Sequence, residues 1–373
     1  MTPRTVLISG AGVAGPTLAY WLARRGFQPT VVERSQGLRS SGSPVDVRGP
    51  ALPVAERMGI MPHLREAATQ ATAVSLVDAS GRQIARVGLP AARSAAGNRE
   101  VELPRGDLAS ILYEAARSDA EFLFDDTIIT MQQDEHGVDV DFDHAAPRRF
   151  DLIIGADGLH STVRRLAFGP ESDFVHHMGI YVATMPLDGP VNDPSHVLMY
   201  NTPGKLLSIH PSRDKALAAF IFRSCAIDGF NHHNTEQHKR IVVEAYTGAG
   251  WRAPELLDQL RETEDLYFDS VSHVRLSAWA RNRIGLLGDA ASSVSLFGDG
   301  SSLAIAGAFT LAESLAAAPT DHTAAFRHYE TAHRTLVDPK QRGMRQVAAL
   351  LVPKSRTGIA VRNLAARAWP NRP

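Results

Sequence analysis

Apolar and polar residues alternate in blocks at the start of the chain. Residues Thr5–Ser9 form a short apolar run that is typical of a buried strand in a parallel sheet. A helix is expected over Thr17–Arg25, because Leu18 and Leu22 are about one turn apart and share a face. A second apolar run, Thr30–Val32, follows. The pattern predicts a strand–helix–strand unit with parallel strands.

Three glycines occupy the turn between the first strand and the helix. Gly10 permits the tight turn, Gly12 lets the backbone approach a pyrophosphate, and Gly15 lets helix and strand pack closely. A pyrophosphate would then lie against free N–H groups at the positive end of the helix dipole. Glu33 follows the second apolar run and can accept hydrogen bonds from an adenosine ribose, whereas its charge would repel a 2′-phosphate. The unit predicts a bound dinucleotide, either NAD or FAD, and argues against NADP at this position.

The apolar pattern changes further along the chain. Short strands with alternating or aromatic positions over residues 178–276 are typical of an antiparallel sheet. On either side, apolar strands and helices recur, as at the strand Phe150–Ile154 and the helices Leu108–Arg117 and Leu303–Ala317. We expect an α/β (α+β) fold, in which a Rossmann-like nucleotide domain carries an inserted, mainly antiparallel sheet domain and C-terminal helices. The expected divisions are 1–73, 100–175 and 277–340 for the nucleotide domain, 74–99 and 176–276 for the inserted domain, and 341–373 for the C-terminal helical segment.

Composition narrows the range of partners. The 373 residues are 44% hydrophobic with a net charge of -1, so we expect two domains with large cores and no nucleic-acid partner. Cys225 is the single cysteine, which excludes an intrachain disulfide, and the histidines lack the spacing of a metal motif. The first strand begins near the N-terminus and no long apolar run occurs, so we expect a cytoplasmic protein. We also expect a monomer or a weak dimer, although no sequence pattern indicates the oligomeric state.

The C-terminal residues 354–372 contain basic residues and no acidic ones, with Val361 and Leu364 among the apolar residues between them. This pattern is compatible with a helix at a membrane surface. We favour a helix that packs over the rest of the protein with its basic face in water, and we expect no membrane partner.

Two further motifs follow the glycine turn. They are Asp157-Gly158-x-x-Ser161-x-x-Arg164 and Gly288-Asp289-Ala290-Ala291. Together with the glycine turn and Glu33-Arg34, they occur in the order found in class A flavoprotein monooxygenases, the family typified by para-hydroxybenzoate hydroxylase. The chain resembles this family over nearly its whole length. The resemblance implies tightly bound FAD, with NADPH or NADH binding transiently, since no second glycine turn of this kind occurs.

The resemblance also implies which residues contact the cofactor. Arg105 would reach the ribityl or phosphate region, Arg48 would lie beside the flavin, and Asp157 would contact both FAD and the pyridine nucleotide. Arg48 and Arg105 could instead be surface charges, and Arg164 either braces the loop of the second motif or forms a purely structural ion pair. The expected cofactor-binding residues are Gly10, Gly12, Ala14, Gly15, Glu33, Arg34, Arg48, Arg105, Asp157, Gly158, Gly288, Asp289, Gly300, Ser301 and Ser302.

The third motif and the helix after it would contact the flavin end of the cofactor. Asp289 ends a predicted strand, where it could bind the ribityl chain, although an ordinary strand-to-loop turn would have the same sequence. The helix that follows Gly300 starts with Ser301 and Ser302, which are good N-cap residues. Its N-terminus would stabilise negative charge on the reduced flavin.

The inserted sheet offers candidate substrate contacts. They are Met199, His210, Phe220, Phe222 and Arg223. Phe220 and Phe222 alternate onto one face of a strand, and for each of them taken singly we favour a place in the core of the sheet. Arg223 could pair with an enolate or phenolate, or could be a surface charge.

Stretches around Arg48 and Arg105 are similar to the tetracycline-inactivating branch of the family, which implies a bulky polycyclic phenol or enol as substrate. The implied reaction is hydroxylation of an electron-rich aromatic or polycyclic molecule with NAD(P)H and O2, through a C4a-hydroperoxyflavin and without a catalytic side chain. The run 292–300 departs from the family because it lacks prolines and adds Asp299. A flavin dehydrogenase or oxidase, or a non-catalytic flavin- or ligand-binding homologue, therefore remains an alternative.

Overall fold

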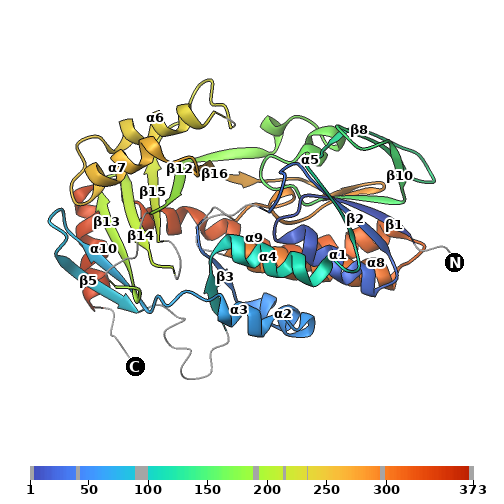
Figure 1. Ribbon diagram of the computed structural model, residues 1–373, viewed down its shortest axis with the longest axis horizontal. Helices are drawn as coiled ribbons and strands as arrows, with labels where there is room; N and C mark the ends of the chain where they lie inside the picture. Colours follow the sequence, from blue (N-terminus) through green and yellow to red (C-terminus); the bar gives the residue numbers. More distant parts are fainter. Residues whose placement is uncertain are drawn as a thin grey trace.

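Two parts lie side by side in the molecule, each built around one β-sheet (Figure 1). Strands β12 (Val175–Pro186) and β16 (Tyr267–Val274) belong to the second sheet and extend toward the first part. The computed structural model describes residues 4–38, 43–88, 100–187, 193–212, 216–232, 234–294 and 299–368.

The first part contains a six-stranded sheet in the order β17-β18-β11-β1-β2-β7. Neighbouring strands are parallel except for the edge pair β17–β18. The central strands are apolar and almost wholly buried, as expected where helices cover both faces of a parallel sheet. The sheet is therefore assembled from segments that are far apart in the sequence. The strands are β1 (Thr5–Ser9), β2 (Gln28–Glu33), β7 (Glu121–Phe124), β11 (Leu152–Gly155), β17 (Ala280–Arg281) and β18 (Ile284–Leu286).

Helix α8 (Asp299–Ala317) is the most apolar helix of this part, and it lies between α1 (Ala14–Arg24) and α9 (His322–Leu351). Its length and composition alone would allow it to cross a membrane, but 67% of the apolar stretch is buried inside the protein. Packing between two helices accounts for its apolar character. Helix α1, which packs against α8, also contacts α4 (Arg105–Ala116).

Three of these helices include about one turn more at the N-terminal end than the apolar periodicity predicts. Each added turn contains glycine, serine or charged residues and lies near the gap between the two parts. These residues do not extend the apolar face of the helix, so the apolar periodicity does not detect them. The first observed and first predicted residues are Ala14 and Thr17 in α1, Arg105 and Leu108 in α4, and Asp299 and Leu303 in α8.

The second part contains a seven-stranded sheet in the order β16-β12-β15-β14-β13-β4-β5. It is antiparallel except for the pair β13–β4. Helices α6 (Thr235–Tyr246) and α7 (Ala253–Glu262) pack on one face, where Phe220 and Phe222 contact the ring of Tyr246. The remaining strands are β4 (Ala73–Val77), β5 (Gln83–Gly88), β13 (His196–Thr202), β14 (Lys205–His210) and β15 (Leu217–Arg223).

Shorter elements connect the two parts and cover their edges. A three-stranded sheet β10-β9-β8 flanks the first part, and β3 pairs with β6 near the junction. These elements are β3 (Val45–Val47), η1 (Gly49–Ala51), α2 (Leu52–Met58), α3 (Met61–Glu66), β6 (Val101–Leu103), β8 (Ile128–Gln133), β9 (Val138–Phe142), β10 (Arg148–Phe150), α5 (Thr162–Ala167), η3 (Glu171–Asp173) and η4 (Gly288–Ala290). Residues 89–99, expected in the inserted domain, lie outside the described residues, as do residues 1–3, 295–298 and 369–373.

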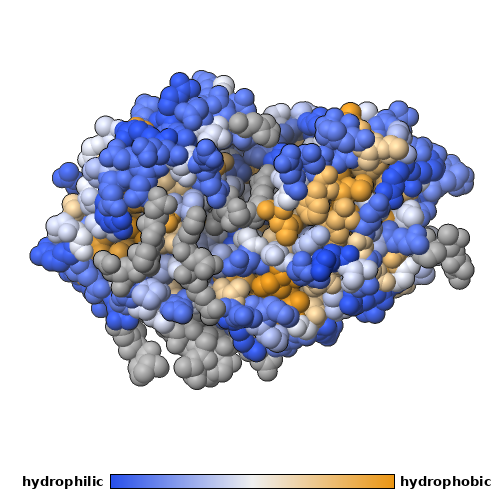
Figure 2. Space-filling model, in the orientation of Figure 1, coloured by the Kyte–Doolittle hydropathy of each residue, from blue (hydrophilic) through white to orange (hydrophobic). Residues whose placement is uncertain are grey.

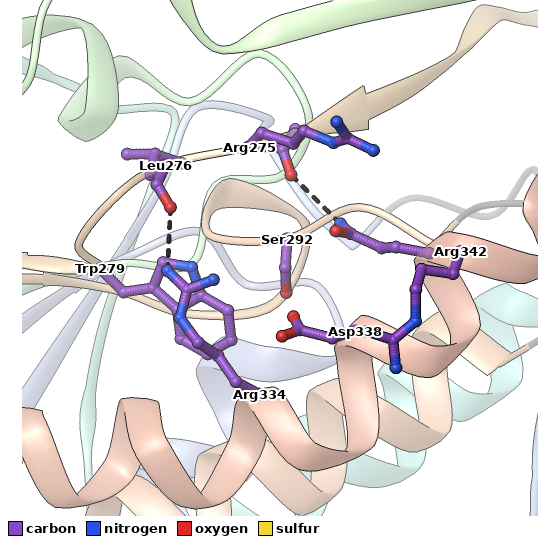
Figure 3. Close-up of a pocket in the computed structure, with 9 residues that line it drawn as sticks. Arg275, Leu276, Trp279, Ser292, Arg334, Asp338 and Arg342 are labelled. Carbon is purple, nitrogen blue, oxygen red and sulfur yellow. Dashed lines mark hydrogen bonds between the residues drawn. The ribbon is translucent and has the colours of Figure 1, made fainter.

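The boundary expected at residue 340 falls within α9, which continues to Leu351 and contains Pro339. A small cavity lies between α9 and the end of β16 (Figure 3). Helix α10 (Arg356–Ala368) packs against β5 and β13. Its Arg362 donates to Asn201 Oδ1 at 2.9 Å, whereas Val361 is 64% exposed. The helix thus packs over the second sheet as favoured from the sequence, but part of its apolar face, rather than only its basic face, meets water.

Phe220 tests whether its face of the sheet is core. Replacing Phe220 with Ala should destabilise the protein by about 3–5 kcal/mol, because a fully buried phenyl ring leaves a cavity behind. The midpoint of thermal unfolding would report the change. Ile221→Ala on the opposite face is the matched control and should cost less. Equal midpoints for Phe220→Ala and the unmodified protein would contradict this packing.

Candidate functional site

A cavity of about 670 Å³ lies between the two parts. It extends continuously from Glu33 and Arg34, past Asp289, to Met199 and His210 on the second sheet. The space-filling view shows a hollow between the two parts, with apolar surface on the side of the first part (Figure 2). One elongated ligand can therefore contact the first sheet and reach the second sheet.

The cavity gathers residues that the sequence places far apart. Of the expected cofactor-binding residues, all except Gly15 and Ser302 line it. This placement follows from topology, because β1, β2, β11 and β18 are parallel and their carboxyl ends meet along one edge of the sheet. Residues after these four strands thus reach one cavity.

The glycine turn after β1 is shaped by close backbone contacts. Gly10 has φ +104°, and a Cβ there would lie 2.6 Å from the carbonyl oxygen of Ala156. A Cβ at Gly15 would lie only 1.9 Å from the Gly10 carbonyl oxygen, so Gly15 allows α1 to approach the strand. A Cβ at Gly12 would meet no protein atom within 4 Å. Gly12 therefore leaves open space where a diphosphate would approach the backbone.

Glu33 has a structural role in addition to the ribose contact that we predict for it. Its Oε2 accepts a hydrogen bond from the Ala11 N–H at 2.8 Å, and its Oε1 accepts one from the Ser35 N–H at 3.0 Å. The carboxylate thus holds the glycine turn in place through the Ala11 N–H, and it also lines the cavity. Its remaining lone pairs can accept hydrogen bonds from ribose hydroxyls.

The second and third motifs are joined inside the protein by Arg164. Its side chain is fully buried and donates to the carbonyl oxygens of Ala290, at 3.1 Å, and Leu159. A Glu171 oxygen lies 3.6 Å from its guanidinium group. The brace that we expect is therefore made mainly through backbone carbonyls. It holds the loop after β11 against the loop after β18.

Asp157 directs its carboxylate mainly at its own loop. It accepts hydrogen bonds from the Ser161 hydroxyl, the Val163 N–H at 3.1 Å and the Ser9 hydroxyl at 3.3 Å. Burial raises the pKa of Asp157, which these hydrogen bonds oppose. Asp157 and Gly158 line the cavity, and their contact with FAD or a pyridine nucleotide stays a prediction.

Asp289 and Arg105 line the cavity between its end at Glu33 and its end at the second sheet. Both bring charged side chains to this part of the wall. Burial raises the pKa of Asp289, whereas the positive charge of Arg105 lowers it. Gly288, with φ +62°, turns the chain so that Asp289 faces the cavity at the end of β18. A cationic donor and an acceptor in one wall suit a ribityl chain and its phosphate.

Ser301 and Ser302 do not cap α8, because the helix already includes Asp299. Both hydroxyls donate to the carbonyl oxygen of Asp46, at 2.7 and 2.8 Å. Ser302 Oγ also accepts a hydrogen bond from the Arg48 N–H at 3.0 Å. The two serines therefore attach β3 to the start of α8, and this attachment corrects the N-cap interpretation.

Arg48 lines the cavity within a network of charges that the sequence did not predict. Its guanidinium group lies 2.8 Å from Asp299 and 3.2 Å from Asp46, and Lys340 lies 3.0 Å from the other oxygen of Asp299. Burial lowers the pKa of Arg48, but the two carboxylates outweigh this effect and raise it. The added charge of the altered 292–300 run thus holds Arg48 in place. Residues 295–298 of that run lie outside the described part.

The wall formed by the second sheet contains only some of the expected substrate contacts. Met199 and His210 line the cavity, together with Ala219 and Ile221 of β15. Phe220 and Phe222 face α6 instead, because successive side chains of a strand alternate between faces. The alternation was therefore predicted correctly, but it places these two rings in the sheet core.

Arg223 also lies away from the lining of the cavity. Its guanidinium group donates to the carbonyl oxygens of Val352, at 2.7 Å, and Ala348, at 2.8 Å. These carbonyls belong to the last turn of α9, where a cation satisfies free acceptors and complements the helix dipole. Arg223 caps α9 and positions Leu351, which does line the cavity.

His210 and Ser208 bring polar groups to this mostly apolar wall. Burial lowers the pKa of His210 to about 4, so the imidazole is neutral at pH 7. Its Nε2 lies 3.0 Å from the Ser208 hydroxyl, and no partner for its Nδ1 occurs among the described residues. A neutral imidazole adds a polar ring to this wall without placing a charge in it.

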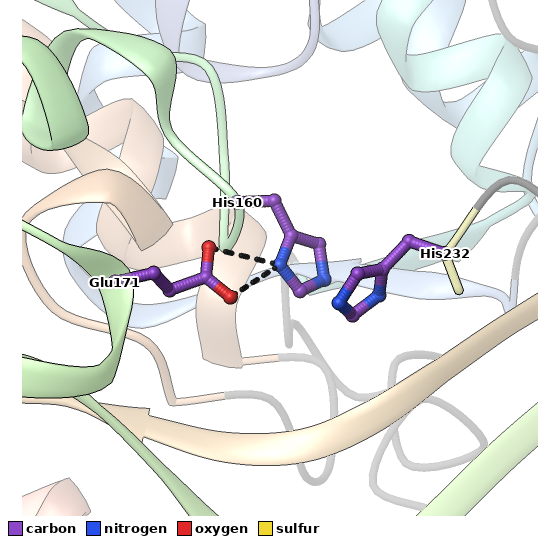
Figure 4. A group of neighbouring side chains, drawn as sticks. All are labelled: His160, Glu171 and His232. Carbon is purple, nitrogen blue, oxygen red and sulfur yellow. Dashed lines mark hydrogen bonds and ion pairs between the residues drawn. The ribbon is translucent and has the colours of Figure 1, made fainter. Parts of the chain in front are cut away.

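His160 connects the two parts beside the cavity (Figure 4). Its Nδ1 lies 3.0 and 3.1 Å from the oxygens of Glu171, and its Nε2 lies 3.2 Å from Asp269 of β16. Burial lowers its pKa, but hydrogen bonds to Asp269 and Glu171 outweigh burial and raise it to about 9. Although the spacing of His160, Glu171 and His232 would also allow a metal ion, the proton held by His160 at neutral pH competes with metal binding.

Comparison with known proteins identifies the family. A sequence profile described as an FAD binding domain matches residues 4–338. A flavin-dependent monooxygenase from Legionella longbeachae serogroup 1 (strain NSW150) is 34% identical over 346 residues, covering 90% of this chain and 87% of the relative. The chain belongs to the FAD-dependent monooxygenase family.

Other members of the family extend the likeness. An uncharacterized protein from Mycobacterium tuberculosis (strain ATCC 25618 / H37Rv) is 38% identical over 344 residues, covering 91% of this chain and 92% of that protein. The crystal structure of the tetracycline destructase Tet(55) is 33% identical, with a TM-score of 0.85 over 98% of this chain and 95% of that one. FAD-dependent monooxygenases are oxidoreductases, and the glycine turn and the continuous cavity of this chain fit an extended FAD molecule.

Several lining residues were not found from the sequence. Ala219, Ile221 and Leu351 line the substrate side of the cavity, and Asp269 lines it beside His160. Alternation along β15 gives two sets of residues but not which set faces the cavity, since both are apolar. The amphipathic helices α6 and α7 indicate that one face of the sheet is covered, but they do not indicate which of the two sets lies on that face.

The space above Gly12 gives the first prediction for this site. Gly12→Val should leave the fold intact, because its Cβ meets no protein atom within 4 Å. The side chain would occupy the space for the diphosphate and weaken FAD binding at least about tenfold. The ratio of flavin to protein absorbance after purification measures this, and Gly88→Val, also in open space, is the control. Full FAD content in Gly12→Val would contradict the assignment of this turn.

The His160 cluster predicts how stability depends on pH. The pKa of His160 is about 9 in the folded protein and 6.5 for the unperturbed side chain, so its contribution is complete below about pH 6.5 and is lost as pH rises through about 9. The difference in thermal midpoint between the protein and His160→Gln should therefore shrink across this window. His63→Gln, on the exposed surface of α3, should show no such trend. A constant difference up to pH 10 would rule out a protonated His160.

Proposed function

We propose that this chain hydroxylates an electron-rich aromatic or polycyclic small molecule with one atom of O2, using NADH or NADPH as reductant. The observation that supports this most directly is the single cavity that joins the glycine turn to an apolar wall of the second sheet. Cofactor and substrate would share one enclosed space. FAD, when bound, would accept a hydride from NAD(P)H and activate O2 for oxygen transfer to the substrate.

The residues of the chain would bind and orient the reactants. The glycine turn and the N-terminus of α1 would hold the diphosphate, with Glu33 at the ribose. Arg105 and Asp289 would hold the linking chain, which sets where the flavin ring lies. The N–H groups at the start of α8, near Gly300, would stabilise negative charge that develops on the ring.

The wall of the second sheet supports the proposed substrate class. Its apolar side chains would exclude water and pack against fused rings, and neutral His210 would hydrogen-bond a phenol or enol oxygen. The similarity to the tetracycline destructase Tet(55) makes tetracycline-like compounds suitable first candidates. Phenols with smaller ring systems are the second set to test.

One observation favours a different reaction on the same scaffold. Arg48, which the resemblance places beside the flavin, is engaged by Asp46 and Asp299 instead of being free for a ligand. An enzyme with this arginine fixed could act as a dehydrogenase or oxidase, or bind flavin and ligand without turnover. The products of O2 consumption distinguish these reactions from hydroxylation.

The test of the proposed function measures NAD(P)H oxidation by the FAD-loaded protein with and without each candidate compound. Hydroxylation predicts substrate-stimulated oxidation of NADH or NADPH and one ¹⁸O atom from ¹⁸O2 in the organic product. One H2O2 formed for each molecule of the compound oxidised, with no ¹⁸O in the organic product and no NAD(P)H consumed, would indicate an oxidase. A flavin that NAD(P)H never reduces would indicate a binding protein.

A variant of the cavity wall provides a control for where the substrate binds. Ile221→Trp would fill the substrate side of the cavity and should abolish stimulation by bulky substrates, with FAD content unchanged. Ile241→Trp, on helix α6 outside this lining, is a control for an added indole group.

A further inference from the structure

A second cavity of about 270 Å³ lies between the end of β16 and the middle of α9 (Figure 3). Arg275, which follows β16, forms one side of it, and Asp338 and Arg342 of α9 form another. Trp279 and Ser292 lie deeper and are almost completely buried. The proposed function leaves this cavity without a role.

The arginines that line the cavity differ in whether they are paired. Arg334 is engaged, since it pairs with Glu330 at 2.7 Å, donates to the Leu276 carbonyl oxygen and stacks on Trp279. For Arg275 and Arg342, no hydrogen bond or ion pair of the side chain occurs among the described residues. Two guanidinium groups are therefore available to a ligand.

The surface around this cavity is basic. Burial lowers the pKa of His273, and the nearby charges of Arg275, Arg345 and His176 lower it further. Asp338 is the acidic residue among those that line the cavity. Positive charge gathered on one concave surface attracts anions and increases their rate of encounter.

This cavity borders the flavin end of the main cavity. Ser292 lines the small cavity, whereas the next residue, Ser293, lines the large one. Gln341 links α9 to this partition by donating to the carbonyl oxygens of Ser293 and Val274, both at 3.1 Å. A ligand here would lie on the other side of the loop that follows the third motif.

We propose that the small cavity binds the phosphate-bearing half of the pyridine nucleotide. Arg275 and Arg342 would bind its phosphate groups, because guanidinium groups match the geometry of phosphate oxygens. Asp338 would accept a hydrogen bond from a ribose hydroxyl. The identity of this ligand rests on the proposed function, because a reductant has to approach the flavin.

Size and exposure support a ligand that binds only in part and only transiently. A volume of about 270 Å³ is below the range of about 300–1,000 Å³ for drug-sized ligands, so half of a dinucleotide fits and a whole one does not. The other half would project from the cavity. Arg275 and Arg342 are exposed to solvent, which limits affinity and favours rapid release of the spent cofactor.

The experiment titrates ADP, which carries no hydride, into the FAD-loaded protein in a calorimeter. Arg275→Ala and Arg342→Ala should each weaken ADP binding about five- to tenfold. Asp338→Asn should leave ADP binding unchanged, because the amide oxygen of Asn can still accept the hydrogen bond from the ribose hydroxyl. The same variant should bind inorganic pyrophosphate more tightly, since pyrophosphate has no ribose and a repelling charge is removed. Arg327→Ala, on the exposed surface of α9 outside the cavity, is the matched control and should change nothing. The flavin spectrum of each variant checks that FAD remains bound.

The outcomes separate this inference from the proposed function. Weaker ADP binding together with a higher KM for NADH or NADPH in the two arginine variants supports it. Equal ADP binding in Arg342→Ala and Arg327→Ala, or no ADP binding, overturns it even if NAD(P)H oxidation is normal. Arginine-dependent ADP binding without any flavin reduction by NAD(P)H would support the site as a nucleotide site and would contradict only the proposed function.

Discussion

The close approach of α1 to the turn after β1 is the constraint on which the rest of the cofactor site depends. With the space for a Cβ at Gly15 only 1.9 Å from the Gly10 carbonyl oxygen, no side chain fits between helix and strand. This contact aims the N-terminus of α1 at the edge of the sheet. It also brings Ala11 within reach of Glu33, which hydrogen-bonds its N–H. The single contact between Gly15 and Gly10 thus sets the positions of helix α1, of the glycine turn and of Glu33 together.

A second constraint joins segments that are far apart in the chain. The buried guanidinium group of Arg164 bonds to the loops that follow β11 and β18, so those loops have a fixed separation. A buried guanidinium group is costly unless it has partners, and here the carbonyl oxygens of Ala290 and Leu159 each accept a hydrogen bond from it, with a Glu171 carboxylate 3.6 Å away. The part of the cavity between these loops, where we predict the flavin, is therefore positioned by contacts inside the protein.

The sequence predicts the nucleotide-binding part well because its signals are local. The apolar run of β1, the glycines after it and Glu33 lie within one strand–helix–strand unit, and each has a steric or electrostatic reason to be where it is. The other two motifs could also be recognised from the sequence, because a strand that ends in a fixed turn is a local feature. Their convergence then follows from parallel topology.

The substrate side was predictable only in part, because its decisive contacts are long-range. Alternation along β15 does not reveal which face α6 covers, so Phe220 was as plausible in the cavity as Ile221. Arg223 caps a helix whose end lies more than a hundred residues away. The hydrogen bond between Arg48 and Asp299 joins residues that are 251 positions apart in the chain. Pairings of this kind depend on the assembled structure and leave no periodic trace in the sequence.

The continuous strands β12 and β16 have a consequence for how large molecules enter. They pair with each other from Val175↔Val274 to Thr184↔Tyr267, with an irregularity between His177 and Tyr181. A hydrogen-bonded ribbon of this length twists more easily than it stretches. Twisting of this ribbon would therefore change the angle between the two parts while keeping the hydrogen bonds of the ribbon, and with that angle the width of the cavity that incoming molecules enter.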